Sequence, residues 1–168
     1  MDQENLAVRL RRLKMIVFDF DGVFTDGKVS VDEDGRESVV CSRKDTLRFP
    51  ELRKLGIKLV VISKEKNPVV ARRCGKMGVE CFCGVDGKLD LFQEILRREK
   101  LAAVESVFVG DDINDLECLK YAGVAFTVAD GHKECRAAAA DITTRRGGAH
   151  AVREICDLIL DCLKEKES

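Results

Sequence analysis

The order of apolar and polar positions divides this 168-residue chain into short apolar runs that alternate with segments of helical spacing. The apolar runs are rich in β-branched and aromatic residues, as buried strands are. Strands that alternate with helices predict an α/β fold with a doubly wound parallel sheet, covered by helices on both faces. We expect strands at residues 15–20, 58–62, 80–82, 106–109 and 124–127, and helices at residues 47–55, 68–77, 88–99, 113–122 and 149–163.

Residues at the predicted helix ends agree with this division. Asn67 and Pro68 suit the N-cap and the first turn of the helix that begins there. Gly56 and Gly78 each stand one step beyond a predicted helix, where glycine commonly adopts the left-handed conformation. The last predicted helix carries an apolar stripe, so one of its faces should pack on the core.

Residues 28–40 interrupt the alternation of strands and helices. Two short runs flank an Asp-Gly pair, which predicts a β-hairpin within a flap at about residues 25–41. The acidic residues Asp32, Glu33 and Asp34 lack the bidentate glutamate of a calcium loop, so we interpret them as a solvated turn. Because no linker or repeat is visible, we expect residues 1–168 to form a single domain.

Composition and charge narrow the class of protein. A formal net charge of -1 gives no basic surface for nucleic acid or for an anionic membrane. No apolar stretch approaches the ~20 residues that span a bilayer. The first residues are acidic and polar, unlike a secretory signal, so we expect a cytoplasmic protein. The eight cysteines then read as reduced thiols packed as small apolar groups, including the close pair Cys81 and Cys83.

Two clusters of aspartates, far apart in the sequence, each follow a predicted strand. Asp19 and Asp21 follow the first strand, and Asp111, Asp112 and Asp115 follow the fourth. Carboxylates at the carboxyl ends of parallel strands face the crevice in which open α/β sheets bind ligands. Like charges in a shared site need a cation to stay ionised, and oxygen ligands favour Mg²⁺, which commonly also engages phosphate. The pattern therefore indicates phosphoryl transfer.

The individual residues fit that chemistry. Asp19 and Asp21 are two residues apart at a strand end, so one could attack phosphorus while the other protonates the leaving oxygen. Ser63 and Lys88 follow two further predicted strands, where they could bind the same phosphate. Taken singly, each has an ordinary explanation: aspartates cap helices, and Ser63 and Lys88 would be surface residues. The combination is what favours a site.

Together these segments resemble the haloacid dehalogenase superfamily of phosphohydrolases, in order and over essentially the whole chain. The resemblance implies a Rossmann-like fold in which Asp19 is the nucleophile and Asp21 the general acid and base. It implies Mg²⁺ bound by Asp19, by the Asp21 backbone carbonyl and by Asp111, with Asp112 and Asp115 as secondary ligands or orienting groups. The matching residues are Asp19-Phe20-Asp21-Gly22-Val23, Ser63, Lys88 and Gly110-Asp111-Asp112-Ile113-Asn114-Asp115.

Two further segments resemble one branch of the superfamily, which lacks a cap domain. These are Asp26-Gly27 before the hairpin and the run from Gly147 to Glu154. The branch contains phosphatases of 3-deoxy-octulosonate 8-phosphate and of sialic-acid-type 9-phosphates. Its members form homotetramers, in which the hairpin and the C-terminal segment of one subunit help to close a neighbour's active site. A tetramer is therefore implied here as well.

The same resemblance implies substrate contacts at Lys44, Asp45, Glu65, Arg73, Lys76, Gly148 and Arg153. The chain departs from the octulosonate phosphatases at several of these positions. Lys44-Asp45-Thr46 replaces Arg-Asp-Gly, Lys64-Glu65 replaces Gly-Arg, and His150 stands where glycine is typical. A glutamate would accept hydrogen bonds from sugar hydroxyls or an amide, whereas an arginine would bind a carboxylate. On that ground we favour a sialic-acid or deaminated sialic-acid 9-phosphate as substrate, with octulosonate 8-phosphate as the alternative.

A second class of function is a regulatory or assembly module that keeps the fold with little catalysis. The altered Lys44-Asp45-Thr46 segment and His150 motivate it. The intact Asp19, Lys88 and Asp111 argue against it. A mutase or phosphonatase would need a cap domain, for which the sequence has no room. We therefore expect a Mg²⁺-dependent phosphatase that acts on a phosphorylated 2-keto-3-deoxy sugar acid.

Overall fold

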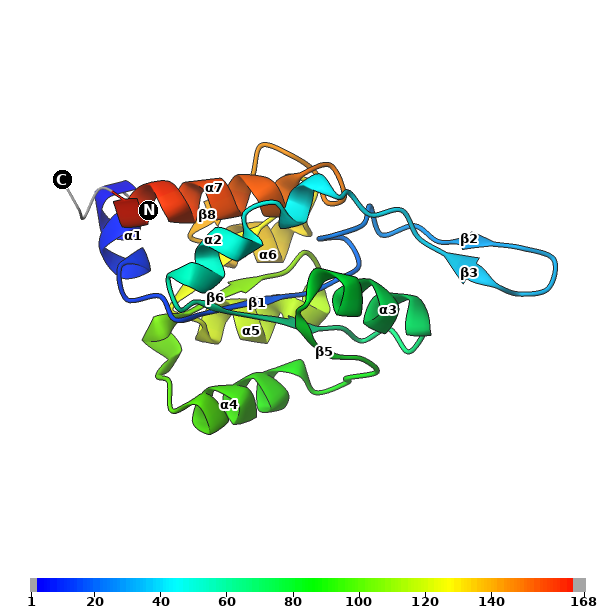
Figure 1. The fold of residues 1–168 in the computed structure, drawn as a ribbon, viewed down its shortest axis with the longest axis horizontal. Helices are drawn as coiled ribbons and strands as arrows, with labels where there is room; N and C mark the ends of the chain where they lie inside the picture. The colour runs from blue at the N-terminus through cyan, green and yellow to red at the C-terminus, as the bar shows by residue number, and fades with distance from the viewer. Residues whose placement is uncertain (1–2, 165–168) are drawn as a thin grey trace.

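The computed structural model describes residues 3–164 and has a six-stranded sheet at its centre (Figure 1). Every neighbouring pair of strands in this sheet is parallel, as the alternation of strands and helices predicts. In spatial order the strands are β5 (Glu80–Phe82), β4 (Lys58–Ile62), β1 (Met15–Phe18), β6 (Ser106–Val109), β7 (Val124–Thr127) and β8 (Asp141–Ile142). From β1 the chain adds β4 and β5 on one side, then crosses back and adds β6, β7 and β8 on the other, so the strand order reverses between β1 and β6.

The sheet has an apolar core on each face. Successive side chains of a strand point to opposite faces, so Ile16 and Phe18 lie in one core cluster and Met15 and Val17 in the other. The first cluster receives side chains of α1 (Gln3–Leu10), α2 (Phe49–Lys54), α3 (Pro68–Met77) and α7 (Ala151–Lys164). The second receives those of α4 (Lys88–Glu99), α5 (Leu116–Tyr121) and α6 (Lys133–Ala138). Figure 1 shows α7 and α4 on opposite sides of the sheet.

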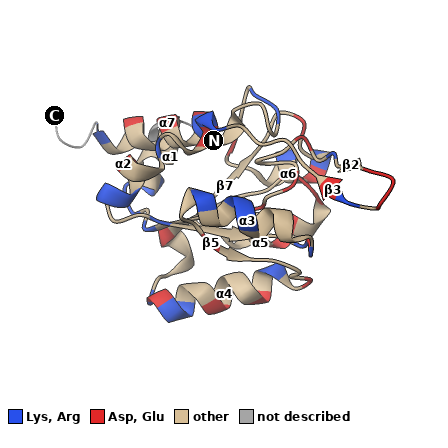
Figure 2. Cartoon of the chain, turned by 45° about the vertical axis from the view of Figure 1, so that its right-hand side comes forward, with Lys and Arg blue, Asp and Glu red and all other residues tan. Residues whose placement is uncertain are grey.

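The predicted hairpin is present and projects away from the sheet (Figure 1). It consists of the antiparallel strands β2 (Ser30–Val31) and β3 (Glu37–Ser38), which are shorter than the sequence suggested. Gly35 in its turn has a φ of 76°, which only glycine adopts readily. Figure 2 shows that the tip of the hairpin is acidic. The hairpin begins just after the first aspartate cluster, so its base lies at the carboxyl edge of the sheet.

Several boundaries follow the sequence closely. The predicted strands at residues 58–62, 80–82, 106–109 and 124–127 are observed with those bounds. Asn67 caps α3 by accepting a hydrogen bond from the N–H of Val69, and Gly78 ends that helix with a φ of 63°. The strand expected at residues 15–20 ends at Phe18, so Asp19 stands at the start of a loop.

Other elements differ from the sequence expectation. The helix expected at residues 113–122 is divided into a 3-10 turn, η3 (Ile113–Asp115), and α5. A second 3-10 turn, η1 (Lys44–Thr46), precedes α2, so that the helix begins two residues later than expected. The elements α1, α6 and β8 were not predicted, because each is too short to show a clear apolar period. The last helix begins at Ala151 and ends at Lys164.

All eight cysteines are free thiols, and Cys118 and Cys156 are buried in the core, as predicted. Within residues 3–164, no helix is long and apolar enough to cross a membrane.

Candidate active site

The two aspartate clusters meet at the carboxyl edge of the sheet, at the point where the strand order reverses. Asp19 follows β1, Asp111 lies two residues beyond β6, and Ser63 follows β4. Crevices at such reversals are where open α/β sheets bind ligands. Here the crevice is an open cleft of about 560 Å³, lined by Asp19, Asp21, Gly22, Gly27, Ser63, Lys64, Glu65, Lys66, Asp86, Asp111, Asp112 and Asn114.

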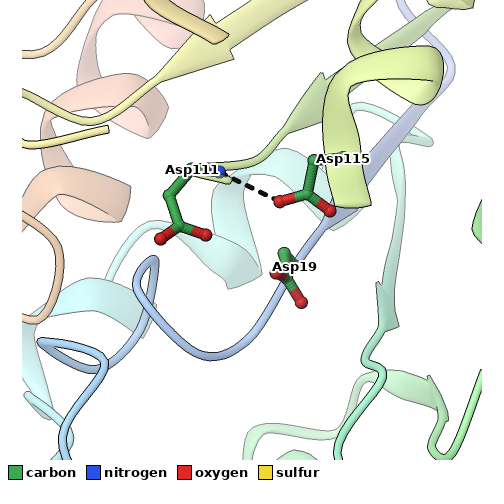
Figure 3. Close-up of side chains that lie close together, drawn as sticks. All are labelled: Asp19, Asp111 and Asp115. Atoms are coloured by element: carbon green, nitrogen blue, oxygen red, sulfur yellow. Dashed lines mark hydrogen bonds between the residues drawn. The ribbon is translucent and has the colours of Figure 1, made fainter. Parts of the chain in front are cut away.

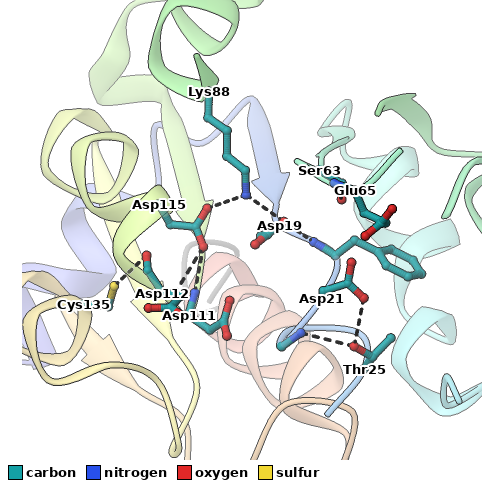
Figure 4. Close-up of polar contacts among 12 residues, drawn as sticks. Asp19, Asp21, Thr25, Ser63, Glu65, Lys88, Asp111, Asp112, Asp115 and Cys135 are labelled. Carbon is teal, nitrogen blue, oxygen red and sulfur yellow. Dashed lines mark hydrogen bonds and ion pairs between the residues drawn. The ribbon is translucent and has the colours of Figure 1, made fainter. Parts of the chain in front are cut away.

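A buried lysine binds two of the aspartates beneath this cleft (Figure 4). The Lys88 ammonium lies 2.8 Å from Oδ1 of Asp19 and 2.7 Å from Oδ1 of Asp115, and all three side chains are almost fully buried. Burial alone would lower the pKa of Lys88, but the two carboxylates outweigh it and raise that pKa. Lys88 therefore stays charged and holds Asp19 in place.

Asp19 shares this single ammonium with a second carboxylate. Burial, together with the Asp115 charge, raises the pKa of Asp19 well above its ordinary value, although Lys88 opposes the shift. Oδ1 of Asp19 also accepts a hydrogen bond from the N–H of Phe20, at 2.7 Å. Both contacts fall on Oδ1, and the structure gives Oδ2 no hydrogen bond among the described residues.

A third carboxylate completes a cluster that fits a cation (Figure 3). Oxygens of Asp19, Asp111 and Asp115 lie within 4.8 Å of one another. Burial, and then the charges of Asp115 and Asp112, raise the pKa of Asp111 to about 7. Three carboxylates with one ammonium leave an excess of negative charge, and hard oxygen donors of this kind suit Mg²⁺.

The shape of the chain around Asp111 also supports a cation site. Gly22 has a φ of 78°, and a Cβ at this position would overlap the Asp111 carboxylate. The glycine is therefore required for the turn and for the close approach of that carboxylate. Asp111 and Asp19 are placed to bind an ion from the two sides of this turn.

The remaining aspartates of the second cluster differ in role. Asp115 accepts a hydrogen bond from the N–H of Asp111 at 3.0 Å, besides its contact with Lys88. Asp112, expected as a metal ligand, is exposed and accepts a hydrogen bond from the N–H of Ile113, at 2.7 Å. Asp112 lines the cleft but lies outside the three-carboxylate cluster, whereas Asp115 belongs to it.

Asp21 stands apart from the cluster, at the start of the turn towards the hairpin. Its carboxylate accepts a hydrogen bond from the hydroxyl of Thr25, at 3.3 Å. Burial raises the pKa of Asp21, and this effect outweighs the Thr25 hydrogen bond. A raised pKa favours the protonated form of this carboxyl group, which is the direction that a general acid needs. Thr25 also accepts hydrogen bonds from the N–H groups of Gly22 and Gly27, and so fixes the turn.

The Ser63 loop forms the opposite wall of the cleft. The N–H of Ser63 donates to the carbonyl of Phe82 at 2.8 Å, and its hydroxyl accepts from the N–H of Glu65 at 3.1 Å. The serine side chain is 1% exposed, yet it lines the cleft. The hydroxyl hydrogen is thus left to donate to a phosphate oxygen.

The predicted substrate contacts divide into two groups. Glu65 lines the cleft, but its Oε1 already accepts hydrogen bonds from the N–H groups of Lys66 and Asn67, at 2.7 Å each. The structure does not bring the others to this cleft. These are Lys44, Asp45, Arg73, Lys76, Gly148 and Arg153.

Three members of the second group have side-chain or backbone contacts that join parts of the chain, while Oδ2 of Asp45 and Nε of Arg73 are buried without a hydrogen-bond partner among the described residues. Asp45 is fully buried and accepts a hydrogen bond from the N–H of Arg153 at 3.2 Å. The Arg153 side chain pairs with Asp157 at 2.7 Å. Arg73 donates to the carbonyl of Ser42 at 3.3 Å. These residues join the end of the hairpin segment to α3 and α7, which a resemblance in sequence does not show.

The structure also adds residues that the sequence argument did not assign to the site. Thr25 was missed, although its position four residues after Asp21 suits a hydrogen bond across a turn. Lys66, Asp86 and Asn114 line the cleft as well. A single signal could have found these three, since each lies in a segment that follows a strand of the parallel sheet.

The comparisons with known proteins agree with this geometry. Residues 86–154 match the family model of the haloacid dehalogenase-like hydrolases. The 3-deoxy-D-manno-octulosonate 8-phosphate phosphatase KdsC of Salmonella typhi is 29% identical over 157 residues, which cover 93% of this chain and 84% of that protein. The KdsC of Haemophilus influenzae is 29% identical over 153 residues, with 90% and 85% covered.

Solved structures extend the comparison to the whole fold. The octulosonate 8-phosphate phosphatase of Moraxella catarrhalis, in complex with magnesium, phosphate and KDO, has a TM-score of 0.93 and 28% identity, with 98% of this chain and 95% of that chain covered. A HAD family hydrolase of Streptomyces avermitilis has a TM-score of 0.87 and 38% identity, with 90% and 87% covered. Fold, aspartate clusters and relatives agree, and the chain belongs to the haloacid dehalogenase-like hydrolases.

Proposed function

We propose that this protein is a Mg²⁺-dependent phosphatase that hydrolyses 3-deoxy-octulosonate 8-phosphate. The observation that carries the proposal is the buried Asp19–Lys88 contact of 2.8 Å at the floor of an open cleft, with Asp21 beside it. The curated relatives that cover this chain almost completely are phosphatases of that substrate. These relatives support a phosphatase of phosphorylated sugar acids, and the eight-carbon acid is the member of that class on which they act.

In the proposed reaction, Oδ2 of Asp19 attacks phosphorus in line and forms an aspartyl-phosphate. Asp21 gives its proton to the sugar oxygen that leaves, and then takes a proton from the water that attacks the intermediate. Lys88 uses two of its three N–H donors on Asp19 and Asp115, so the third can reach a phosphate oxygen. The Ser63 hydroxyl donates to another phosphate oxygen.

Asp19 and Asp111 would hold the magnesium ion, together with the backbone carbonyl of Asp21. When bound, the ion neutralises charge on the phosphoryl oxygens and on the carboxylates. Asp115 orients Asp111 through its backbone N–H and keeps Lys88 in position. Asp112 caps η3 and contributes charge at the edge of the cleft.

The choice of substrate differs from the one that the sequence favoured. Glu65 was the reason to prefer a nine-carbon sialic acid, because its carboxylate was expected to bind sugar hydroxyls. In the structure that carboxylate is engaged by two backbone N–H groups of its own loop. The relatives named above act on the eight-carbon acid, and none of them supports the sialic-acid preference.

Phosphate release from a panel of substrates tests the function. We expect turnover of octulosonate 8-phosphate in the presence of Mg²⁺. Its kcat/KM should exceed that for sialic-acid 9-phosphate by at least about tenfold, because a contact made with one substrate and not with the other commonly changes kcat/KM by this factor. Chelation of the metal by EDTA should abolish turnover, and Mg²⁺ should restore it. A folded protein that binds Mg²⁺ and cleaves neither sugar phosphates nor an aryl phosphate would instead support the non-catalytic module.

We also propose a homotetramer, in which the hairpin of one subunit covers the cleft of a neighbour, within a cytoplasmic enzyme. Val31 and Val40 of the hairpin segment are 60% and 84% exposed, so the hairpin offers apolar side chains that a neighbouring subunit could cover. Light scattering should give four times the subunit mass. The double variant Val31→Asp, Val40→Asp should lower the mass of the assembly and raise KM. The control Val104→Asp, at the opposite edge of the sheet, should change neither. An unaltered assembly mass in the hairpin variant would contradict the proposal.

A further inference from the structure

The loop that follows β7, residues 128–132, is bound to the main chain that carries Asp111. The hydroxyl of the buried Thr127, at the end of β7, donates to the carbonyl of Gly110 at 2.7 Å. The N–H of His132, at the other end of the loop, donates to the carbonyl of Asp111 at 2.7 Å. Because both ends of the loop are hydrogen-bonded to neighbouring main-chain carbonyls, the position of this β7 loop is fixed relative to Asp111.

The β7 loop also reaches the segment that precedes α7. Oδ1 of Asp130 accepts a hydrogen bond from the N–H of Gly147 at 3.0 Å, and the N–H of Ala129 donates to the carbonyl of Arg145 at 3.2 Å. Asp130 is exposed, whereas Gly147 is buried. Among the described residues the structure gives the Gly147 N–H no other acceptor, so removal of this carboxylate would leave a buried donor unpaired.

Gly147 in its turn lies against the catalytic turn that carries Asp21. The main chain of Gly22 and Thr25 approaches Gly147 so closely that no side chain would fit there, and a Cβ would lie 2.9 Å from the carbonyl oxygen of Thr25. The Thr25 hydroxyl donates to the Asp21 carboxylate at 3.3 Å (Figure 4). A shift of Gly147 would therefore move the turn and, through Thr25, the side chain of Asp21.

We propose that Asp130 is a positioning residue for proton transfer by Asp21, because its hydrogen bond to Gly147 holds the catalytic turn in place relative to Asp111. This role rests on the phosphatase function proposed above. Asp130 belongs neither to the cleft lining nor to the three-carboxylate cluster, so it acts through the turn and not on the substrate. Its loss should slow the step that needs a proton more than the steps that do not.

Two phosphate esters of similar size separate proton transfer from the rest of the reaction. Phenyl phosphate releases a basic phenolate, which needs the proton of Asp21, whereas p-nitrophenyl phosphate releases a weakly basic one that can leave without it. For Asp130→Ala we expect kcat/KM for phenyl phosphate to fall about tenfold, and kcat/KM for p-nitrophenyl phosphate to fall at most about twofold. Asp130→Asn keeps an oxygen that can accept from Gly147, so both values should stay near the wild-type ones.

Hydrogen exchange shows whether the hydrogen bond itself is responsible. In Asp130→Ala, mass spectrometry should detect faster exchange in the peptide that contains Gly147, and in Asp130→Asn it should not. The matched control is Asp141→Ala, which removes a half-buried aspartate whose Oδ1 accepts from the N–H of Ile142 at 2.9 Å on β8. This control should alter neither the exchange at Gly147 nor the ratio of the two kcat/KM values.

Equal falls for the two esters in Asp130→Ala would overturn the positioning of Asp21, because a general loss of active protein lowers both values together. Unaltered exchange at Gly147, or an Asn variant as impaired as the Ala variant, would overturn the hydrogen bond as the cause. If Asp130→Ala does not fold, Asp130→Glu moves the acceptor by one methylene and must show the same selective loss. Failure of the folded wild-type protein to hydrolyse either ester or octulosonate 8-phosphate would instead overturn the proposed function.

Discussion

Asp19→Asn should fold normally and lose at least about 10⁴-fold in turnover number, the scale seen when a covalent nucleophile is removed. The amide has the size of the carboxyl group, but its oxygen and nitrogen do not displace an alkoxide from phosphorus. The contacts that orient the side chain, from Lys88 and from the N–H of Phe20, can both be kept by the amide oxygen. Turnover measured with octulosonate 8-phosphate and with an aryl phosphate checks this expectation.

Two controls make the result specific for the nucleophile. Asp26→Asn changes an exposed aspartate of the same loop, which pairs with Lys28 at the surface, and should leave turnover unaltered. Thermal unfolding in EDTA should show Asp19→Asn at least as stable as the wild type, because one of three clustered carboxylates is removed and Lys88 keeps its pair with Asp115. Residual turnover near the wild-type level in the Asn variant would exclude an aspartyl-phosphate at this residue.

Lys88→Met should lower the free energy of unfolding by about 3–5 kcal/mol in metal-free protein, the usual cost of leaving buried charges without their partner. The methionine fills much the same space, but it leaves Asp19, Asp111 and Asp115 in one cluster with no cation. Mg²⁺ should narrow the deficit, because an ion that binds the folded state stabilises it. Denaturant unfolding with EDTA and with Mg²⁺ measures both values.

A second substitution distinguishes lost charge balance from lost packing. Asp115→Asn in the Lys88→Met background removes one unpaired carboxylate and should recover part of the lost free energy of unfolding. Turnover should stay low in this double variant, because the phosphate has lost its ammonium partner. The matched control is Lys58→Met, since Lys58 pairs with Glu80 and Glu99 near the surface and should cost at most about 1 kcal/mol. Equal losses in the two single lysine variants would show that the Lys88 pairs contribute no more than surface pairs.

The sheet was largely predictable from sequence, and the parts that were not have physical reasons. Strands such as β4 and β6 are continuous apolar runs buried on both faces, which leaves little ambiguity. The two-residue β8 carries too few side chains for any pattern. The six-residue α6 is stabilised by packing of Cys135 on the core, a tertiary contact that local sequence does not reveal.

The residues at the floor of the cleft could be predicted from the sequence, whereas the orientation of the residues in its walls could not. Asp19, Asp111 and Lys88 could be found because strand ends in a parallel sheet converge wherever the helices lie. Glu65 was placed correctly beside the cleft, but the direction of its carboxylate depends on two backbone N–H groups whose orientation the sequence does not specify. Asp45 and Arg153, which the resemblance assigns to the substrate, also join η1 to α7 within the described chain, and their contact with substrate stays a prediction.

The loop before α7 lies directly against the loop that carries the nucleophile. A Cβ at Gly147 would overlap the carbonyl of Gly22, and the N–H of Gly148 donates to the carbonyl of Val23 at 3.1 Å. The turn that follows β1 therefore takes part of its shape from a segment far along the chain. A methyl group at Gly147 would force the two loops apart, so Gly147→Ala should displace the turn that carries Asp21 and alter the cleft while every aspartate stays in the sequence.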